Sequence, residues 1–429
     1  MVGTNKKIRI YSILLIAFMF TLPFFISGCG KTKHKSGMAY LKMSYWDENQ
    51  KTSIENLVKT FEKNHPDIKV KPELIPWNQY WIKLDAAASA HEAPDVFWMN
   101  VYLPKYVRAG VIIPFNKFIK KDHLNLNNYF KTSIKLFTYR GKLYAMPVQT
   151  DCITVYYNKG IFNKYHVKYP KNGWTWNDMI KTGLLLKRRI KQAGVKGVYP
   201  LAMELDPQPS YFNLIYQEGG RILSPNGRKP EYNTPQVIAA YKKIIYLMHS
   251  GIMPSFNILS GTKGSEMFIS QKAAMLYMGT WMAKVFDDTS FAKNIGVVVM
   301  PKIKNNITMQ SGVGYSISAN TKYPKAAWKL VKFLSGPEGS KVFAESGSNI
   351  PAYKKAKKYY IKSLKHIDAN VFYEALKHSV PFPTSPTIST WFSLIRQYEP
   401  DIYSGNIPVA TAVKEIANQM NIILSRVKN

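Results

Sequence analysis

Aromatic, acidic and amide side chains gather at the ends of the first three predicted strands. Six of them are candidate ligand-binding residues: Trp46, Asp47, Glu48, Trp77, Trp98 and Asn100. An aromatic ring packs against the C–H face of a sugar ring, while carboxylates and amides pair with the hydroxyl groups at its edge. Such groups must stand on loops and strand ends rather than on the apolar stripe of a helix. Their placement therefore favours a cleft for a polyhydroxylated ligand.

Catalytic motifs are absent from the sequence. It contains no GxxxxGK[ST] phosphate loop, no GxSxG nucleophile motif and no HExxH zinc motif. A glycosidase needs two carboxylates from separate segments that face one bond, and Glu48 with Asp151 is a pair that could do this. A surface glycan-degrading enzyme is therefore an alternative to a binding protein. We expect no cofactor and no metal site.

The chain is strongly basic. Its 59 Lys and Arg residues outnumber 26 Asp and Glu residues, which gives a formal net charge of +33. The basic residues are spread along the chain and fall in no nucleic-acid-binding motif, so we expect no nucleic acid partner. A cationic surface suits a polyanionic cell wall or anionic lipid, and part of the charge could instead recognise an acidic ligand. Lys51, Arg221 and Lys284 are candidates for that second role by position alone.

The N-terminus has the pattern of an export signal. Three basic residues precede an apolar run over 10–26, and the tetrapeptide Ile-Ser-Gly-Cys that ends at Cys29 resembles a bacterial lipobox. We predict a lipoprotein signal peptide over 1–28, lipidation at Cys29 and a lipidated tether over 29–38. The protein would then be held by its lipid on the extracytoplasmic face of the membrane of a Gram-positive cell.

Strands and helices alternate through the rest of the chain. Strands are predicted over 39–45, 67–75, 94–99, 153–157, 273–278, 295–299 and 311–318. Between the first three strands, helices are predicted over 53–64 and 80–90, with a loop over 76–78. The Thr175 and Asp178 spacing predicts a capping box at the start of a further helix. This order predicts two α/β lobes with helices on the sheet faces.

Seven segments, in their order and spacing, resemble the extracellular solute-binding proteins of ABC importers, in the carbohydrate-binding group that includes maltose-binding protein. They are SYWDENQ, APDVFWMN, YAMPVQTDCITVYYNKGIF, YPKNGWTWNDM, YFNLIYQEGG, FISQKAAMLYMGTWM and AAWKLVKFLSGPEGS, within 40–425. The resemblance implies an α/β, two-lobe periplasmic-binding-protein-like fold with hinge crossovers and a ligand cleft between the lobes. It implies lobe 1 over 39–149 plus 311–348, and lobe 2 over 150–310 plus 349–429.

The resemblance also implies further ligand residues. Asp151 matches an acidic family residue that bonds sugar hydroxyls, and three positions match cleft aromatics of the group: Tyr211, Trp281 and Trp391. The segment after Asn100 lacks the acidic–basic pair of the relative, which argues against maltose itself.

The implied function is that of a monomeric, lipid-anchored protein that makes and breaks no bond. It would capture a neutral or uronic acid oligosaccharide and deliver it to the transmembrane subunits of an ABC permease. A non-sugar ligand, such as glycerol phosphate or a peptide, is the alternative within this class.

Overall fold

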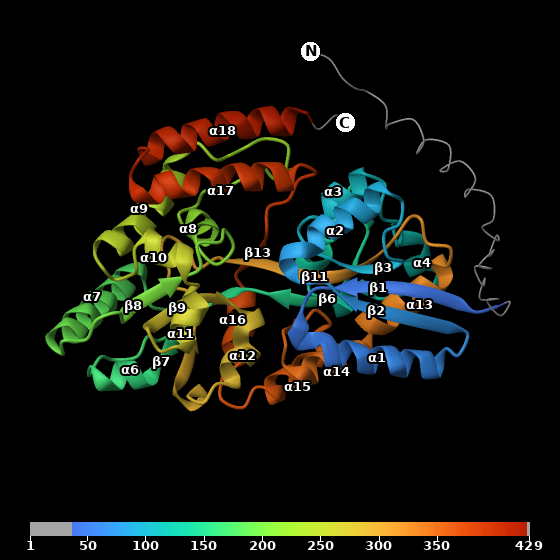
Figure 1. The fold of residues 1–429 in the computed structure, drawn as a ribbon, viewed down its shortest axis with the longest axis horizontal. Coiled ribbons are helices and arrows are strands. Elements are labelled where there is room, and N and C mark those ends of the chain that lie inside the picture. The colour runs from blue at the N-terminus through green and yellow to red at the C-terminus, as the bar shows by residue number, and fades with distance from the viewer. Residues whose placement is uncertain (1–36, 427–429) are drawn as a thin grey trace, which may run out of the picture. The chain divides into compact units, whose positions relative to one another are not determined.

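The computed structural model describes residues 37–426, and residues 39–429 form one compact unit built on two main sheets (Figure 1). The larger sheet has seven strands in the order β12-β6-β11-β3-β1-β2, with β13 paired beside the beginning of β11. The smaller sheet has four strands in the order β10-β7-β9-β8. Helices pack on both sheets, so the molecule has the predicted α/β class.

The seven-stranded sheet is parallel on one side and antiparallel on the other. Its strands are β1 (Ala39–Tyr45), β2 (Ile68–Leu74), β3 (Val96–Met99), β6 (Met146–Asp151), β11 (Thr308–Ile317), β12 (Ile350–Pro351) and β13 (Ser379–Pro381). β1 runs parallel to β2 and β3, whereas β11 runs antiparallel to β3 and β6. Because β1 and β3 are parallel, the residues that follow them, Trp46 and Asn100, leave the sheet at the same edge.

Helices cover both faces of this sheet. They are α1 (Lys51–Asn64), α2 (Trp77–Ser89), α3 (Leu103–Arg108), α4 (Asn116–Lys121), α5 (Lys131–Leu136), α13 (Pro324–Ser335) and α14 (Pro337–Ser346). A short hairpin of β4 (Thr138–Tyr139) and β5 (Lys142–Leu143) follows α5. Figure 1 shows α2 and α3 on one side of the strands and α1 and α13 on the other. The apolar stripe of α1 is buried, as its helical spacing predicts.

The remaining strands form the four-stranded sheet. They are β7 (Ile153–Asn158), β8 (Tyr199–Met203), β9 (Ala273–Gly279) and β10 (Ile295–Val298). The remaining helices are α6 (Lys159–Lys164), α7 (Trp176–Gln192), α8 (Tyr211–Gln217), α9 (Pro235–His249), α10 (Phe256–Gly261), α11 (Gly264–Ile269), α12 (Ala283–Asp287), α15 (Lys357–Ser363), α16 (Asn370–Leu376), α17 (Ile388–Ser404) and α18 (Val409–Ser425). These helices pack on the four-stranded sheet, on one another or, for α15, against α14 and β12. The capping box of α7 is confirmed: Asp178 N donates to Thr175 Oγ1 at 3.2 Å, and Thr175 N donates to Asp178 Oδ2 at 2.9 Å.

Between β6 and α15, the chain passes between the two sheets at three places; β13 later pairs with the larger sheet again. Only Cys152 separates β6 of the larger sheet from β7 of the smaller one, and its side chain is buried. The second passage links β10 to β11, and the third follows α14, where β12 pairs with β6 before the chain continues to α15. These passages lie at or close to the crossovers that the family resemblance implies.

Two predicted elements begin three residues earlier than expected, and the strands β6 and β8 were not predicted. The helix α2 begins at Trp77, inside the segment predicted as a loop, because Pro76 directly precedes it and the Trp77 ring packs on a neighbouring ring. The strand β11 begins at Thr308 rather than at 311, because its first three residues pair with β13. A strand as short as Ser379–Pro381, with a proline at its end, has no periodicity from which to predict it.

Membrane attachment was predicted from the N-terminus. The signal peptide over 1–28, the lipidation site Cys29 and the tether up to residue 36 lie outside the described residues. Within residues 37–426, no helix has both the length and the hydropathy needed to span a bilayer.

Candidate functional site

Trp46 lies at the centre of an aromatic cluster beyond the end of β1. Its ring centroid lies 4.8 Å from that of Trp98, 5.3 Å from that of Trp77 and 4.9 Å from that of Tyr80, all in edge-to-face geometry. The ring of Trp81, one turn after Trp77 on α2, also packs on Trp46, with the two ring centroids 5.6 Å apart. Trp98 is fully buried and Trp46 is half-buried, but Trp77 is 50% exposed. The cluster therefore has a rigid base and an exposed ring, which can pack on a ligand.

The carboxylates beside this cluster differ in their surroundings. Asp47 caps the short 3-10 turn Glu48–Gln50, since its Oδ1 accepts from Asn49 N at 3.0 Å and its Oδ2 accepts from Gln50 Nε2 at 2.8 Å. The amide of Gln50 also bonds that of Gln149 on β6. Asp47 is thereby fixed and connected to β6, whereas Glu48 is exposed.

Asp151 is a buried carboxylate at the end of β6. Its Oδ1 accepts from Gln208 Nε2 at 2.7 Å and from the backbone nitrogen of Ser311 at 3.0 Å. Burial raises the pKa of Asp151 to about 6, and these two hydrogen bonds only partly oppose the effect. Close to neutral pH, this carboxyl group can exist in either protonation state, so it can accept a hydrogen bond from a sugar hydroxyl or donate one.

The pairing of β7 with β9 places Trp281 on a segment adjacent to the one that carries Asp151. Ile153 pairs with Gly279, and one step further Thr280 N donates to Cys152 O at 3.1 Å. Asp151 and Trp281 each lie two residues beyond the Ile153–Gly279 pair, on adjacent antiparallel segments. A Cβ on Gly279 would lie 2.0 Å from the nearest Trp281 ring atom, so the ring rests directly over this glycine. Trp281 is half-buried.

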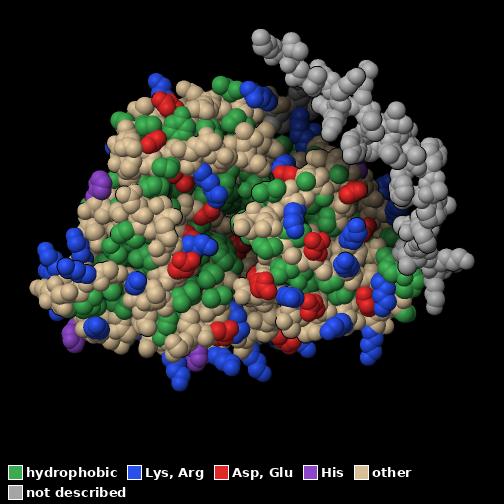
Figure 2. Space-filling model, in the orientation of Figure 1, with side chains coloured by type: hydrophobic (Ala, Val, Ile, Leu, Met, Phe, Trp, Pro, Cys, Tyr) green, Lys and Arg blue, Asp and Glu red, His purple; other side chains and the backbone are tan. Residues whose placement is uncertain are grey.

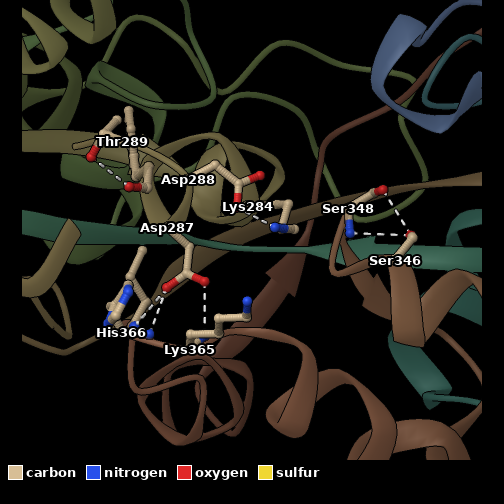
Figure 3. Close-up of polar contacts among 10 residues, drawn as sticks. Lys284, Asp287, Asp288, Thr289, Ser346, Ser348, Lys365 and His366 are labelled. Atoms are coloured by element: carbon tan, nitrogen blue, oxygen red, sulfur yellow. Dashed lines mark hydrogen bonds and ion pairs between the residues drawn. The ribbon is translucent and has the colours of Figure 1, made fainter. Parts of the chain in front are cut away.

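The third crossover is fastened beside Trp281. Thr280 Oγ1 bonds Asn349 Oδ1 at 3.2 Å, directly before β12. Figure 3 shows the Asp287 carboxylate at the end of α12 turned toward the backbone of Lys365 and His366, whose nitrogens donate to it at 2.7 Å each. Figure 3 also shows Ser346 and Ser348 bonded to each other through their hydroxyl groups. The Thr280–Asn349 bond joins the crossover to the segment that carries Trp281, and the Asp287 bonds join α12 to the chain that follows α15.

Polar residues that the sequence did not identify complete the surroundings. Asp206, which precedes α8, pairs with Arg396 of α17. Tyr102, which follows β3, is largely buried, which raises its pKa, and Arg396 opposes this rise. The residues that follow β3 therefore lie close to Arg396. Gln208, which holds Asp151, is another unpredicted member, and a spacing of 57 residues gave no signal for their contact.

Four of the predicted ligand residues contact mainly the protein itself. Trp98 lies under Trp46, and Asn100 Oδ1 accepts from Tyr102 N at 3.1 Å. Tyr211 is fully buried and stacks on Tyr241, with ring centroids 5.0 Å apart. Trp391 is also fully buried, and its Nε1 donates to Ser385 Oγ at 2.8 Å. Their roles in ligand binding stay predictions.

The surface is hollowed where these elements meet. Figure 2 shows a recess between the part of the surface that lies over the four-stranded sheet and the part that lies over the seven-stranded sheet, with hydrophobic side chains at its edge. Among residues 37–426, no group of three or more His, Cys, Asp and Glu side chains could hold a metal ion. The arrangement can bind a ligand through rings and hydrogen bonds.

A protein-family model described as "Bacterial extracellular solute-binding protein" matches residues 45–341. The chain belongs to this family. The family resemblance drawn from the seven sequence segments is therefore confirmed, and so is the two-lobe fold.

This solute-binding protein is similar in sequence and in structure to several known proteins. It is 26% identical over 348 residues to the galactooligosaccharide-binding protein of Bacillus subtilis strain 168, covering 77% of each chain. It is 24% identical over 424 residues to the maltodextrin-binding protein of the same strain, covering 95% of each. The structure of an ABC substrate-binding protein from Listeria monocytogenes in complex with cycloalternan matches with a TM-score of 0.82, at 24% identity, over 90% of this chain and 99% of that one.

Proposed function

We propose that this solute-binding protein captures an oligosaccharide outside the cell and delivers it to the transmembrane subunits of an ABC permease. One observation carries the proposal: partly exposed tryptophan rings follow strands of both sheets, and carboxylates lie at strand ends of the larger sheet. These residues form what we call the strand-end site: Trp46, Asp47, Glu48, Trp77, Asp151 and Trp281. The sugar-binding names of several relatives support the same conclusion.

The strand-end site is suited to hold a sugar by two kinds of contact. Trp77 and Trp281 offer ring faces for the C–H surface of a pyranose, and Asp47 and Asp151 are fixed acceptors for hydroxyl groups. A site that pairs each hydroxyl rejects a ligand that lacks one, because a buried polar group would be left unpaired. The ligand would be bound without chemical change.

Lobe closure is the proposed signal to the permease. The proposed lobes are 39–149 plus 311–348 and 150–310 plus 349–429, joined by the three passages between the sheets. A ligand that contacts rings on one lobe and Trp281 on the other binds the closed state better, so it shifts the population toward closure. The permease would recognise this closed state.

The proposal also includes attachment of the protein to the cell membrane by a lipid. Cleavage after residue 28 and lipidation of Cys29 would hold the protein, as a monomer, on the extracytoplasmic face of a Gram-positive cell membrane. Replacement of Cys29 by Ser should move the protein from the membrane fraction to the medium, unless the uncleaved signal peptide retains it.

The test is a melting-temperature screen. Because residues 39–429 form one compact unit, the chain from Gly30 can be studied in solution. A ligand that binds only the folded state raises the melting temperature with concentration. We expect a rise with one class of oligosaccharide, no change in the ligand by chromatography, and no rise with amino acids or peptides. A rise with peptides alone, or the appearance of a cleaved product, would contradict the proposal.

A further inference from the structure

A cavity of about 720 Å³ lies apart from the strand-end site. Its walls come from the α5–β4 segment, the loop that follows α8 and the chain that follows β13, and none of the ten predicted ligand residues lines it. Four cationic side chains do, and we call it the basic cavity after them: Lys135, Arg140, Arg221 and Arg228. No Asp or Glu is among its lining residues.

The four cations are not neutralised by ion pairs. Of the ion pairs within residues 37–426, none involves any of the four. Glu218, beside the lining residue Gly219, is already held by Lys243 at 2.8 Å and by Lys304 at 3.3 Å. Glu231 also lies near Tyr216. Unneutralised cations around a concave surface produce a positive potential that attracts anions.

The loop that carries Arg228 is fixed in position. Arg228 N donates to Asn226 Oδ1 at 3.1 Å, and Ser224 Oγ donates to the same oxygen at 2.8 Å. Gly227 between them has a φ of +68°, and a Cβ there would lie 2.7 Å from the carbonyl oxygen of Thr384. Glycine is required here for two reasons: its φ is positive, and the loop tip lies directly against the segment after β13, which leaves no space for a Cβ. The direction in which Arg228 leaves the backbone is therefore set in advance of binding.

The remaining lining suits a sugar better than a simple anion. The rings of Tyr139 and Tyr216 are half-buried at the wall, and Asn305 is held by a hydrogen bond from its Nδ2 to Tyr216 O at 3.0 Å. The volume falls in the range of about 300–1,000 Å³ that is typical of small-molecule sites. The Arg140 guanidinium lies over the Tyr139 ring, 5.6 Å from its centroid, so the cation and the ring stand side by side at the wall. A single phosphate or carboxylate would fill only a small part of this space.

We propose that the basic cavity is a second binding site, for a short oligosaccharide that carries carboxylate groups. Its carboxylates would pair with the guanidinium groups of Arg140, Arg221 and Arg228, which present a planar fork of donors to a carboxylate. Its ring faces would pack on the tyrosines. The walls of the basic cavity come from both proposed lobes, so lobe closure would change its shape, but its cations and rings are separate from the residues of the strand-end site.

Calorimetric titration of the full chain, in mild detergent at 0.15 M salt, tests this proposal with trigalacturonate as probe. The double variant Arg221→Gln/Arg228→Gln removes two cavity cations. The matched control Arg188→Gln/Arg189→Gln removes the same charge from the exposed face of α7. We expect the cavity variant to weaken trigalacturonate binding about 30-fold, because it removes two guanidinium groups that would contact the ligand. The control should change binding less than twofold, because Arg188 and Arg189 lie outside the cavity and act on the ligand only through screened long-range charge. Arg221→Lys/Arg228→Lys should restore only part of the affinity.

Three results would overturn the proposal. The first is that trigalacturonate does not bind. The second is that the cavity variant and the control lose affinity equally. The third is that Trp281→Ala abolishes trigalacturonate binding while the arginine double variant keeps it. The last result would place the acidic sugar in the strand-end site. Because the screen for the proposed function uses neutral sugars as well, failure of either site is visible independently of the other.

Discussion

The strand-end site and the basic cavity are built in opposite ways. The strand-end site rests on buried rings and ordered strands: Trp98 lies under Trp46, and Gly279 lies under Trp281. The basic cavity is bordered by loops, and its selectivity comes from exposed cations. Rings and buried acceptors select by shape and hydroxyl pattern, whereas cations select by charge. A net charge of +33 therefore does not by itself specify the chemistry of every binding site on the molecule.

The largest expected effect is on stability, from Trp98→Ala. Trp98 is fully buried between Trp46, Tyr45 and Tyr315, so its loss leaves a cavity and should cost about 3–5 kcal/mol of unfolding free energy. Urea denaturation measures this. The loop variant Arg228→Gln serves as the contrast and should change stability by less than about 0.5 kcal/mol. If the two variants lost similar amounts of unfolding free energy, the contrast between a site on buried rings and a site on exposed loops would be wrong.

Trp281→Ala should be the most damaging change for neutral sugar binding. The half-buried ring is the candidate stacking surface on the segment adjacent to that of Asp151, and loss of such an anchor typically costs about 2–4 kcal/mol, or roughly 30- to 1,000-fold in affinity. Titration with the sugar found in the melting screen measures it. Trigalacturonate binding at the basic cavity should stay within twofold of the parent protein. If both ligands were lost together, the two sites could not be separate.

The elements that hold these sites were predictable to different degrees. β1 and the capping box of α7 follow from local patterns. They are the short apolar segment Ala39–Tyr45, in which burial alternates over the first five residues, and the Thr175–Asp178 spacing. The beginning of β11 was not predictable, because it depends on pairing with β13, about 70 residues away in the sequence. Local physics decides the first kind of element, and tertiary contacts decide the second.

The candidate site also has features that were predictable from the sequence and features that were not. That Trp46 and Asp47 follow a strand could be predicted from the sequence, since a strand end is a local feature. The contact of Gln208 with Asp151 and the pair of Arg396 with Asp206 could not be predicted, because these partners are 57 and 190 residues apart in the sequence. The basic cavity is a further example, since its cations come from segments about 80 residues apart that no sequence period connects.

Asp151→Asn should separate the binding and stability roles of this carboxylate. The amide oxygen can still accept from Gln208 and Ser311, so the hydrogen bonds persist while the buried charge is removed. Folding raises the pKa from its ordinary value of 3.8 to about 6, so the folded protein favours the protonated form. The parent protein therefore loses stability as the pH rises from about 4 through 6, by about 2–3 kcal/mol, and the variant should not.

Denaturation of both proteins at pH 4 and at pH 8 measures this difference, which should be near its full size at pH 8 and small at pH 4. Affinity for the neutral sugar at pH 8 should fall about tenfold, since a hydrogen bond to a charged acceptor is replaced by a neutral one. An unchanged affinity would remove Asp151 from the strand-end site while leaving its structural role intact.

Trp77→Ala should have the smallest effect, and it tests which ring of the aromatic cluster meets the ligand. Trp77 is half exposed at the first turn of α2, so its truncation should cost less than about 1 kcal/mol of stability. If its exposed face packs on a sugar, affinity should fall about fivefold, as expected for a ring at the edge of a site. Trp174→Phe, at a buried tryptophan directly before α7, is the control and should leave affinity unchanged. If Trp77→Ala also left affinity unchanged, Trp77 would serve only to cover Trp46, and the ligand would meet the seven-stranded sheet at Trp46 alone.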